Sequence, residues 1–173
     1  MKDELRGCLC PMTAEEDREV MEWKYPAPYD MYNWEAEDDP AELLDGSYFS
    51  CREKDGRLGG FLCFGPNATI PTKESVYEAG YLDIGLGLRP DLCGKGLGRG
   101  LLELGMEWAR SELGASRFRL AVAQFNLRAQ KVYRSCGFRE ISRVTHRTLG
   151  APFLLMVWEP SDQSRTSEKG QSL

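Results

Sequence analysis

The spacing of hydrophobic positions predicts helices and buried strands in the second half of the chain. A helix is predicted over roughly residues 96–113 and ends near Gly114, because apolar side chains recur there three and four residues apart, namely Leu97, Leu101, Leu104 and Trp108. A second helix begins at Asn126 and is stopped by Gly137. Apolar runs predict strands at 118–123, at about 138–147 and at 153–158.

The first half contains stronger turn and cap signals. Thr13 and Glu16 have the spacing of a capping box, which opens a helix that runs to about Trp23. The dipeptide Asp55-Gly56 predicts a hairpin between its flanking apolar runs. The remaining expected elements are a first strand at 5–10, a short helix at 40–44, hairpin strands at 48–53 and 58–64, and a long central strand at 76–88. This order predicts an α/β fold: one mixed sheet with helices on both faces.

The glycine-rich stretch 93–98 lies between the long strand and the third helix. Gly94, Gly96 and Gly98 lack side chains that would keep a phosphate from the backbone, and a helix N-terminus presents unpaired N–H groups. Neither common nucleotide motif is present: Lys95 is followed by glycine rather than Ser or Thr, and the G-x-G-x-x-G spacing fails. The stretch predicts a pyrophosphate site, with a turn made only for close packing as the alternative.

A second unusual stretch, residues 23–34, contains five aromatic residues and two prolines. The prolines forbid a continuous helix, and five aromatic side chains are too many for an ordinary exposed loop. We therefore expect this segment either to line a substrate cleft or to fold its rings onto the core.

Composition narrows the class of protein. The 173 residues suffice for one domain, here 1–159, and residues 160–173 have the composition of a disordered tail. The net charge of -5 argues against non-specific nucleic-acid binding and is compatible with a cationic acceptor. Six scattered cysteines and one histidine suggest neither a metal site nor a disulfide framework. Without an export signal or a membrane-length apolar run, a cytoplasmic location is expected.

Two motifs together resemble the GNAT superfamily of N-acetyltransferases. The first is the acyl-coenzyme A loop of the family, which corresponds to Cys93-Gly-Lys-Gly96-Leu-Gly98 in this chain. Cys93 stands where the family usually has Gln or Arg. The second is Asn126-x-x-Ala129-x-x-x-Tyr133-x-x-x-Gly137-Phe138, which is similar to the last helix of the family. The order of predicted elements is also that of the GNAT fold, a mostly antiparallel sheet of about seven strands, to about residue 158.

The resemblance implies a binding site for acetyl-coenzyme A and a role for each matching residue. Backbone groups of 93–98 would hold the pyrophosphate, and Asn126 and Ala129 would lie near the pantetheine arm. Backbone N–H groups around Leu86, Gly87 and Leu88 would stabilise the oxyanion. Gly85 and Gly87 also leave one face of the strand open for the thioester arm. The expected cofactor-binding residues are Leu86, Gly87, Leu88, Cys93, Gly94, Lys95, Gly96, Leu97, Gly98, Arg99, Asn126, Ala129 and Tyr133.

The resemblance places Tyr133 as the general acid that protonates the departing thiolate; a core aromatic is the alternative. An amine acceptor must lose a proton before attack, so a carboxylate base would help. Asp83, on the strand face of Gly85 and Gly87, is the first candidate, and Glu78 is the second. A structural carboxylate without a catalytic role is the alternative for both.

The predicted function is an acetyl-coenzyme A-dependent N-acetyltransferase that acts on a primary amine by direct attack in a ternary complex. A non-catalytic acyl-coenzyme A-binding module of the same fold is the alternative. No metal, nucleic acid or membrane partner is expected. The sequence leaves open whether the acceptor is a small molecule or a peptide, which acyl chain is preferred, and whether the chain forms a homodimer.

Overall fold

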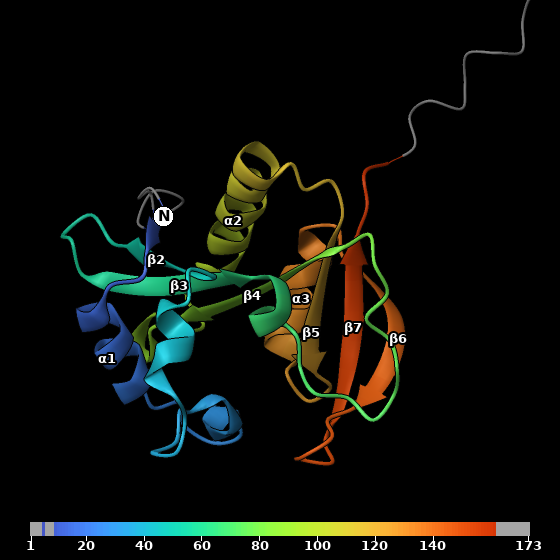
Figure 1. Cartoon of the computed structure of the whole chain (residues 1–173), viewed down its shortest axis with the longest axis horizontal. Helices are drawn as coiled ribbons and strands as arrows, with labels where there is room; N and C mark the ends of the chain where they lie inside the picture. Colours follow the sequence, from blue (N-terminus) through green and yellow to red (C-terminus); the bar gives the residue numbers. More distant parts are fainter. Residues whose placement is uncertain (1–4, 6–8, 162–173) are drawn as a thin grey trace, which may run out of the picture.

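The computed structural model describes residue 5 and residues 9–161, and a seven-stranded sheet forms the centre of this region (Figure 1). The strand order across the sheet is β1-β2-β3-β4-β5-β7-β6. The strands are β1 Cys10–Pro11, β2 Tyr48–Arg52, β3 Leu58–Phe64, β4 Leu82–Leu88, β5 Phe118–Ala123, β6 Arg139–Thr145 and β7 Pro152–Trp158. Neighbouring strands are antiparallel except β4 and β5, which are parallel. The mixed, mostly antiparallel sheet is confirmed.

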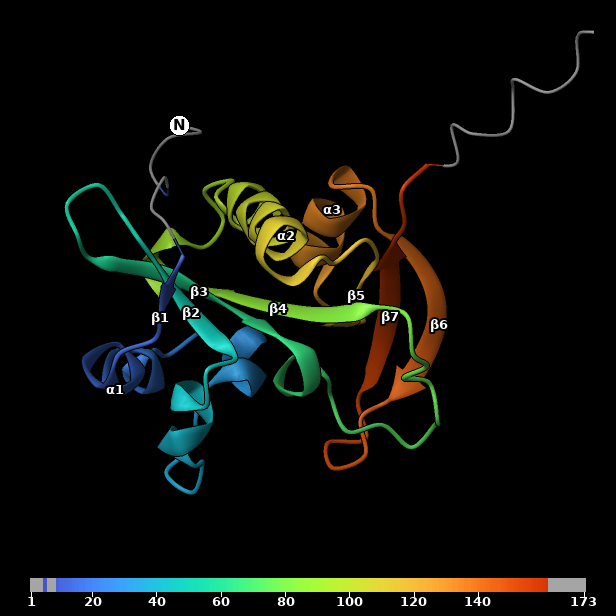
Figure 2. The ribbon, with the colours of Figure 1, turned by 45° about the horizontal axis from the view of Figure 1, so that its top comes forward.

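Helices cover both faces of the sheet, as predicted (Figure 2). The helix α1, Ala14–Glu22, lies on one face, and α2, Gly98–Leu113, lies with α3, Leu127–Ser135, on the other. Fully buried Leu101 and Leu102 of α2 belong to the larger core, and Val20 of α1 belongs to a smaller core on the opposite face. Four short 3₁₀ helices complete the elements: η1 Tyr29–Tyr32, η2 Pro40–Leu44, η3 Gly65–Ala68 and η4 Pro90–Leu92.

Local sequence signals fix the ends of the helices. The Thr13 hydroxyl accepts from the Glu16 amide at 3.2 Å, and the Glu16 carboxylate accepts from the Thr13 amide at 3.1 Å, which is the predicted capping box. The Asn126 side chain accepts from the Ala129 amide at 3.0 Å and caps α3. Gly114 ends α2 at φ 64°, a left-handed conformation that glycine adopts without steric cost.

The parallel strands β4 and β5 touch only at their beginnings. Leu82 pairs with Phe118 and Asp83 with Arg119, and beyond these pairs the two strands separate (Figure 1). β4 remains paired with β3 along 84–88, whereas β5 remains paired with β7. The result is a single sheet with a wedge-shaped opening at its middle.

The strand predicted over 76–88 is wrong in its first part, because β4 begins only at Leu82. Gly80 adopts φ 102° and turns the chain before the strand. The preceding loop bonds to the end of β6 instead: the Lys73 amide donates to the Thr145 carbonyl, and Thr72 forms a bridge with His146. Of the strand expected at 5–10, residues 6–8 lie outside the described residues, as do residues 162–173 of the expected tail.

Candidate active site

A cleft of about 690 Å³ opens where β4 and β5 separate. Its lining comes from the two strands, the glycine-rich turn, α3 and the aromatic segment after α1. The main lining residues are Ile84 to Leu88, Leu120 to Val122, Cys93, Gly94, Gly96 to Arg99, Asn126, Arg128, Ala129, Lys131 to Tyr133, and the rings of Trp23, Tyr25, Tyr29, Tyr32, Trp34 and Phe61. The fold therefore brings the two predicted motifs together in one cleft.

The glycine-rich turn leads directly into α2. Gly94 and Gly96 have φ values of 75° and 79°, so both positions require a residue that tolerates the left-handed region. Leu97 precedes α2 and supplies no side-chain cap, which leaves the first-turn N–H groups open to a ligand. The positive end of the helix dipole points to the same place. The arrangement has the geometry of an anion site.

Arg128, in the first turn of α3, is the cation beside this turn. If Gly94 carried a methyl group, that group would lie 3.6 Å from a guanidinium nitrogen of Arg128, so Arg128 is close to the turn. The guanidinium carbon of Arg128 lies 4.4 Å from the centre of the Tyr29 ring. Arg99 also lines the cleft but pairs with Glu103 at 2.8 Å, and Lys95 is exposed outside the lining. Sequence reasoning missed Arg128; its position two residues after the Asn126 cap was the available signal.

Alternate backbone groups of β4 face the opening. The Leu82 amide donates across to the Arg117 carbonyl at the β5 side, whereas the Arg89 amide donates to the Gly59 carbonyl at the β3 side. Because the direction alternates along a strand, Leu86 and Leu88 face the β5 side. The Tyr25 hydroxyl confirms this for Leu88 by donating to its carbonyl at 2.7 Å. Backbone groups of β4 therefore point into the cleft, because β5 does not pair with this part of the strand.

The space expected over Gly85 and Gly87 is occupied. Phe61 pairs with Gly87 across the sheet, and a methyl group on Gly87 would lie 2.4 Å from the Phe61 ring. At Gly85, the neighbouring atom is the Cys63 sulfur at 2.8 Å. Both glycines are needed because cross-strand side chains lie over them. Phe61 and Cys63 thus cover this face of β4, which corrects the expectation of an open channel.

Tyr133 projects from α3 into the cleft lining. Its ring centre lies 6.3 Å from that of Phe138, and within the described residues its hydroxyl has no hydrogen-bond partner. Burial, with a smaller contribution from Tyr32, raises the pKa of Tyr133 above its ordinary value. The hydroxyl therefore keeps its proton at neutral pH and is available to donate it.

Two further residues of α3 lie near Tyr133 in the same lining. The Asn126 amide donates to the Tyr32 hydroxyl at 3.3 Å, in addition to capping the helix. Ala129, whose amide donates to the Asn126 side chain, has a small side chain that also lines the cleft. Asn126 consequently links the helix of Tyr133 to the aromatic segment.

The structure does not bring the two candidate bases into the cleft. Asp83 is buried in a two-pronged ion pair with Arg119, with N–O distances of 2.7 and 2.9 Å, at the point where β4 and β5 still touch. Hydrogen bonding to Asp83 raises the pKa of Arg119. Glu78 is exposed on the preceding loop, where its carbonyl accepts from Arg119 at 2.8 Å. In the part of the chain that the structure describes, no carboxylate and no imidazole lines the cleft.

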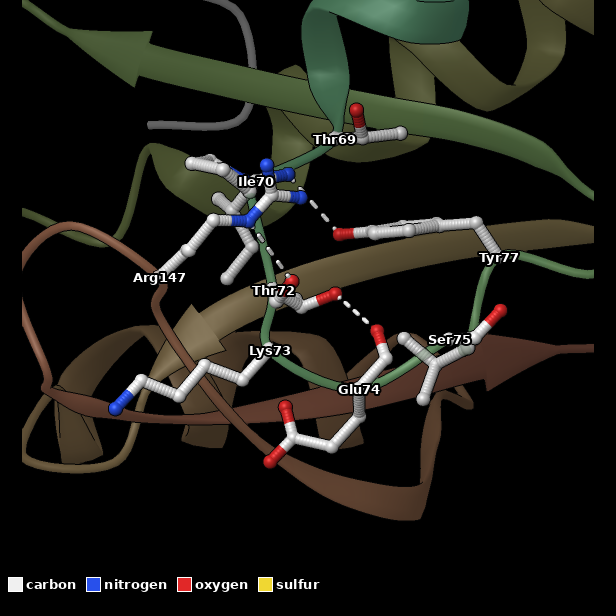
Figure 3. A pocket seen from close by; sticks show the side chains of 10 residues that line it. Thr69, Ile70, Thr72, Lys73, Glu74, Ser75, Tyr77 and Arg147 are labelled. Atoms are coloured by element: carbon white, nitrogen blue, oxygen red, sulfur yellow. Dashed lines mark hydrogen bonds between the residues drawn. The ribbon is translucent and has the colours of Figure 1, made fainter.

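A second hollow lies beneath the loop before β4, between Thr69 and Tyr77 (Figure 3). The Thr72 hydroxyl donates to the Glu74 carbonyl at 2.6 Å, and the Arg147 guanidinium donates to the Thr72 carbonyl at 3.3 Å. The Ile70 amide donates to the Tyr77 hydroxyl at 3.0 Å. The first and third of these bonds fold the loop on itself, and Arg147 ties it to the segment after β6, so these polar groups already have structural partners.

Neither a metal centre nor a membrane span is found in the part of the chain that the structure describes. Among these residues, no group of three or more His, Cys, Asp and Glu side chains is placed to hold a metal ion. No described helix combines the length and the hydropathy needed to cross a bilayer.

Comparisons with known proteins agree with this geometry. The model of the "Acetyltransferase (GNAT) family" matches residues 12–138. A chimera of the spermidine N-acetyltransferase SpeG from Vibrio cholerae and hSSAT superposes with a TM-score of 0.67 at 18% identity, covering 86% of this chain and 92% of that one. A GNAT-family acetyltransferase from Bacillus anthracis gives 0.67 at 13% identity, with coverages of 87% and 93%.

A third solved structure, the aminoglycoside acetyltransferase AAC(6')-Ib in complex with ribostamycin and coenzyme A, gives a TM-score of 0.65 at 20% identity, covering 94% of this chain and 98% of that one. No curated protein matches the chain at a significant level. At these identities the three structures show a shared fold.

Proposed function

The chain belongs to the GNAT family of acetyltransferases, and on that premise we propose that it moves an acetyl group from acetyl-coenzyme A to a primary amine by direct attack in a ternary complex. One observation carries the proposal: a single cleft between β4 and β5 contains the anion-site turn, the Tyr133 hydroxyl and a set of aromatic rings. The Tyr133 hydroxyl has no hydrogen-bond partner among the described residues. The rings come from residues 23–34 and from Phe61. Transfer between two bound substrates requires these parts together.

The donor fits the turn and the cations beside it. Backbone N–H groups from Gly94 to Gly98 would bind the pyrophosphate. The left-handed backbone at Gly94 and Gly96 favours glycine, so no side chain would keep the phosphate away from these groups. Arg128 would add a charged hydrogen bond to a phosphate oxygen, and Arg99 and Lys95 would add weaker, exposed charges. Leu97, Asn126 and Ala129 would line the path of the pantetheine arm.

The donor's thioester supplies an acyl group that is already activated, so no protein nucleophile is needed. The N–H groups of Leu86 and Leu88 face the opening and would stabilise the acetyl oxygen as it gains negative charge. Tyr133 would give its proton to the departing sulfur, because its raised pKa keeps it protonated under assay conditions. Each role falls to a group that the cleft leaves available.

The acceptor loses its proton without a protein carboxylate in this account. Asp83 is held by Arg119 and Glu78 lies on an exposed loop, so we assign neither as the base. An alkylammonium has a pKa of about 10.4 in water, and removal from water lowers it because desolvation disfavours the charged form. The amine therefore enters the apolar cleft neutral and releases its proton to solvent first.

A cytoplasmic location is part of the proposal. The thiols of Cys63, Cys93 and Cys136 are not in disulfides, as in proteins of reducing compartments.

A thiol-release assay with acetyl-coenzyme A and a panel of primary amines tests the proposal. Turnover that requires both substrates and collapses in Tyr133→Phe, while acetyl-coenzyme A binding is retained, is the expected result. Binding of acetyl-coenzyme A with no turnover on any amine would contradict transfer. Turnover that is equal in Tyr133→Phe would contradict the role of the tyrosine.

A further inference from the structure

The acceptor side of the cleft is an aromatic wall built from two distant parts of the chain. The segment between α1 and η2 supplies Trp23, Tyr25, Tyr29, Tyr32 and Trp34, and β3 supplies Phe61. The Trp23 and Phe61 rings are stacked, with centres 6.1 Å apart and planes 29° apart. Rings that pack on one another in this way present a preformed apolar surface to a substrate.

The remaining rings are also held from behind. Phe125 lies 5.7 Å from Tyr29 and 6.4 Å from Tyr32, measured between ring centres. The hydroxyls of Tyr25 and Tyr32 are engaged by the Leu88 carbonyl and by Asn126, respectively. These two hydroxyls are therefore engaged, whereas the indole N–H of Trp23 is buried without a hydrogen-bond partner among the described residues.

Among the described residues, the charged side chains of the lining are all cations. They are Arg99 of α2 and Arg128 and Lys131 of α3, and the Arg128 guanidinium lies over the Tyr29 ring. No carboxylate of the described residues lines the cleft, so a second ammonium group on the acceptor would be buried there without a counter-charge. A monoamine that has released its proton to solvent brings no charge into the cleft and needs no counter-charge there. The lining thus favours one amine and disfavours several.

We propose that the natural acceptor is a monoamine with an aromatic or apolar body, rather than a polyamine or an aminoglycoside. The inference rests on the proposed function and narrows it to one chemical class. In the productive complex, the body of the acceptor lies against Trp23, Trp34 and Phe61, and its amine points toward β4. The acetyl carbon forms a bond to this neutral nitrogen as its bond to sulfur breaks, and Tyr133 gives its proton to the sulfur. The nitrogen then loses its surplus proton, which passes through solvent to Tyr133, so that the products are the amide and the thiol of coenzyme A.

Exposed carboxylates near the aromatic segment offer an alternative binding mode for a polyamine, which the experiment has to test. Asp30, Glu35 and Glu37 are exposed on the segment that contributes the aromatic rings, and Glu35 follows Trp34 directly. An extended polyamine would place its distal ammonium groups among them, whereas a monoamine gains only attraction toward the entrance. Polyamine and aminoglycoside probes are therefore part of the experiment.

The experiment measures kcat/KM with saturating acetyl-coenzyme A for 2-phenylethylamine, tryptamine and hexylamine against spermidine and ribostamycin. The expected result is at least a tenfold preference for the monoamines. A higher kcat/KM for spermidine or ribostamycin would overturn the inference and leave the proposed function standing. Failure of every amine, with acetyl-coenzyme A binding intact, would overturn both.

A pair of matched variants tests the aromatic wall itself. Phe61 lies on the α1 face of the β2–β3 hairpin, whereas Phe49 lies on the opposite face against Trp108 of α2, with ring centres 4.4 Å apart. Phe61→Leu is expected to raise the KM for 2-phenylethylamine about tenfold and to leave the KM for acetyl-coenzyme A unchanged. Phe49→Leu removes the same ring from the other face and should change neither KM. Equal effects of the two variants would overturn the assignment.

Discussion

The donor side and the acceptor side of the cleft differ in the groups that would contact a ligand. The donor side consists of backbone: two left-handed glycines, the uncapped start of α2 and the edge of β4 that β5 leaves unpaired. The acceptor side consists of side chains, above all aromatic rings from the segment after α1 and from β3. Backbone recognition is tied to a short local motif, whereas a side-chain surface can change residue by residue. Substitutions on the donor side should therefore affect transfer to every acceptor, and those on the acceptor side should change which amine is used.

The largest effect is expected where the two sides meet, at Tyr133. Tyr133→Phe should lower kcat by about 10²- to 10⁴-fold, the usual range for losing a general acid, with every acceptor. The Kd for acetyl-coenzyme A should stay within about twofold, since the ring remains. Single-turnover kinetics and calorimetric titration measure the two quantities. A loss of turnover restricted to one acceptor would place Tyr133 on the acceptor side instead.

The next effect concerns the junction that holds the two halves of the sheet together. Asp83→Ala should reduce the free energy of unfolding by about 3–5 kcal/mol, because Arg119 would be left as an uncompensated buried charge. Asp55→Ala, at an exposed pair with Arg57, should cost much less, because solvent screens this pair, and serves as the control. Urea titration followed by fluorescence provides both values.

A double variant separates this structural role from catalysis. Asp83→Leu combined with Arg119→Met removes both charges and should recover most of the lost stability, since a buried pair is often replaceable by apolar residues. The double variant should also retain acetyl transfer. Recovery of stability with loss of turnover would return Asp83 to the role of base.

The pH profile distinguishes the two ways of deprotonating the amine. Without a carboxylate base, kcat/KM should rise about tenfold per pH unit from pH 7 to 9, following the neutral fraction of an amine with a pKa of about 10.4. The raised pKa of Tyr133 keeps the acid protonated across this range, so no alkaline decline is expected there. A plateau above about pH 6 would instead indicate a protein carboxylate as base.

The smallest effect is expected at the glycine-rich turn. Gly96→Ala forces a side chain into the left-handed region, at a cost of about 1–2 kcal/mol, which corresponds to a rise in the Kd for acetyl-coenzyme A of about fivefold to thirtyfold if the turn relaxes. Gly56→Ala is the matched control, because Gly56 has φ 87° in the β2–β3 hairpin and open space around it. Equal Kd values for the two variants would contradict the assignment of the turn.

Features encoded by neighbouring residues could be predicted from the sequence. The capping box at Thr13, the Asn126 cap and the left-handed Gly114 depend on contacts within a few residues, and each lies where the pattern predicts it. The sheet follows as well, because the order of elements and the two motifs constrain it. The aromatic content of residues 23–34 predicted either a cleft lining or rings packed on the core, and both occur: all five rings line the cleft, and Trp23 is also buried in the smaller core.

Features that depend on distant residues could not be predicted. Asp83 was a reasonable base on its strand, but its partner Arg119 lies 36 residues away and is brought to it only by the β4–β5 register. The space over Gly87 looked open because its occupant, Phe61, comes from another strand. The loop before β4 looked extended because its hydrogen bonds to β6 cross more than 70 residues.

The distance between the sulfur of bound coenzyme A and the Tyr133 hydroxyl, in a crystal structure of the complex, tests the central claim most directly. The account predicts a separation within hydrogen-bond reach, below about 4 Å for sulfur, with the pyrophosphate on the turn from Gly94 to Gly98. Coenzyme A bound elsewhere, or its sulfur turned away from Tyr133 within the cleft, would contradict the account.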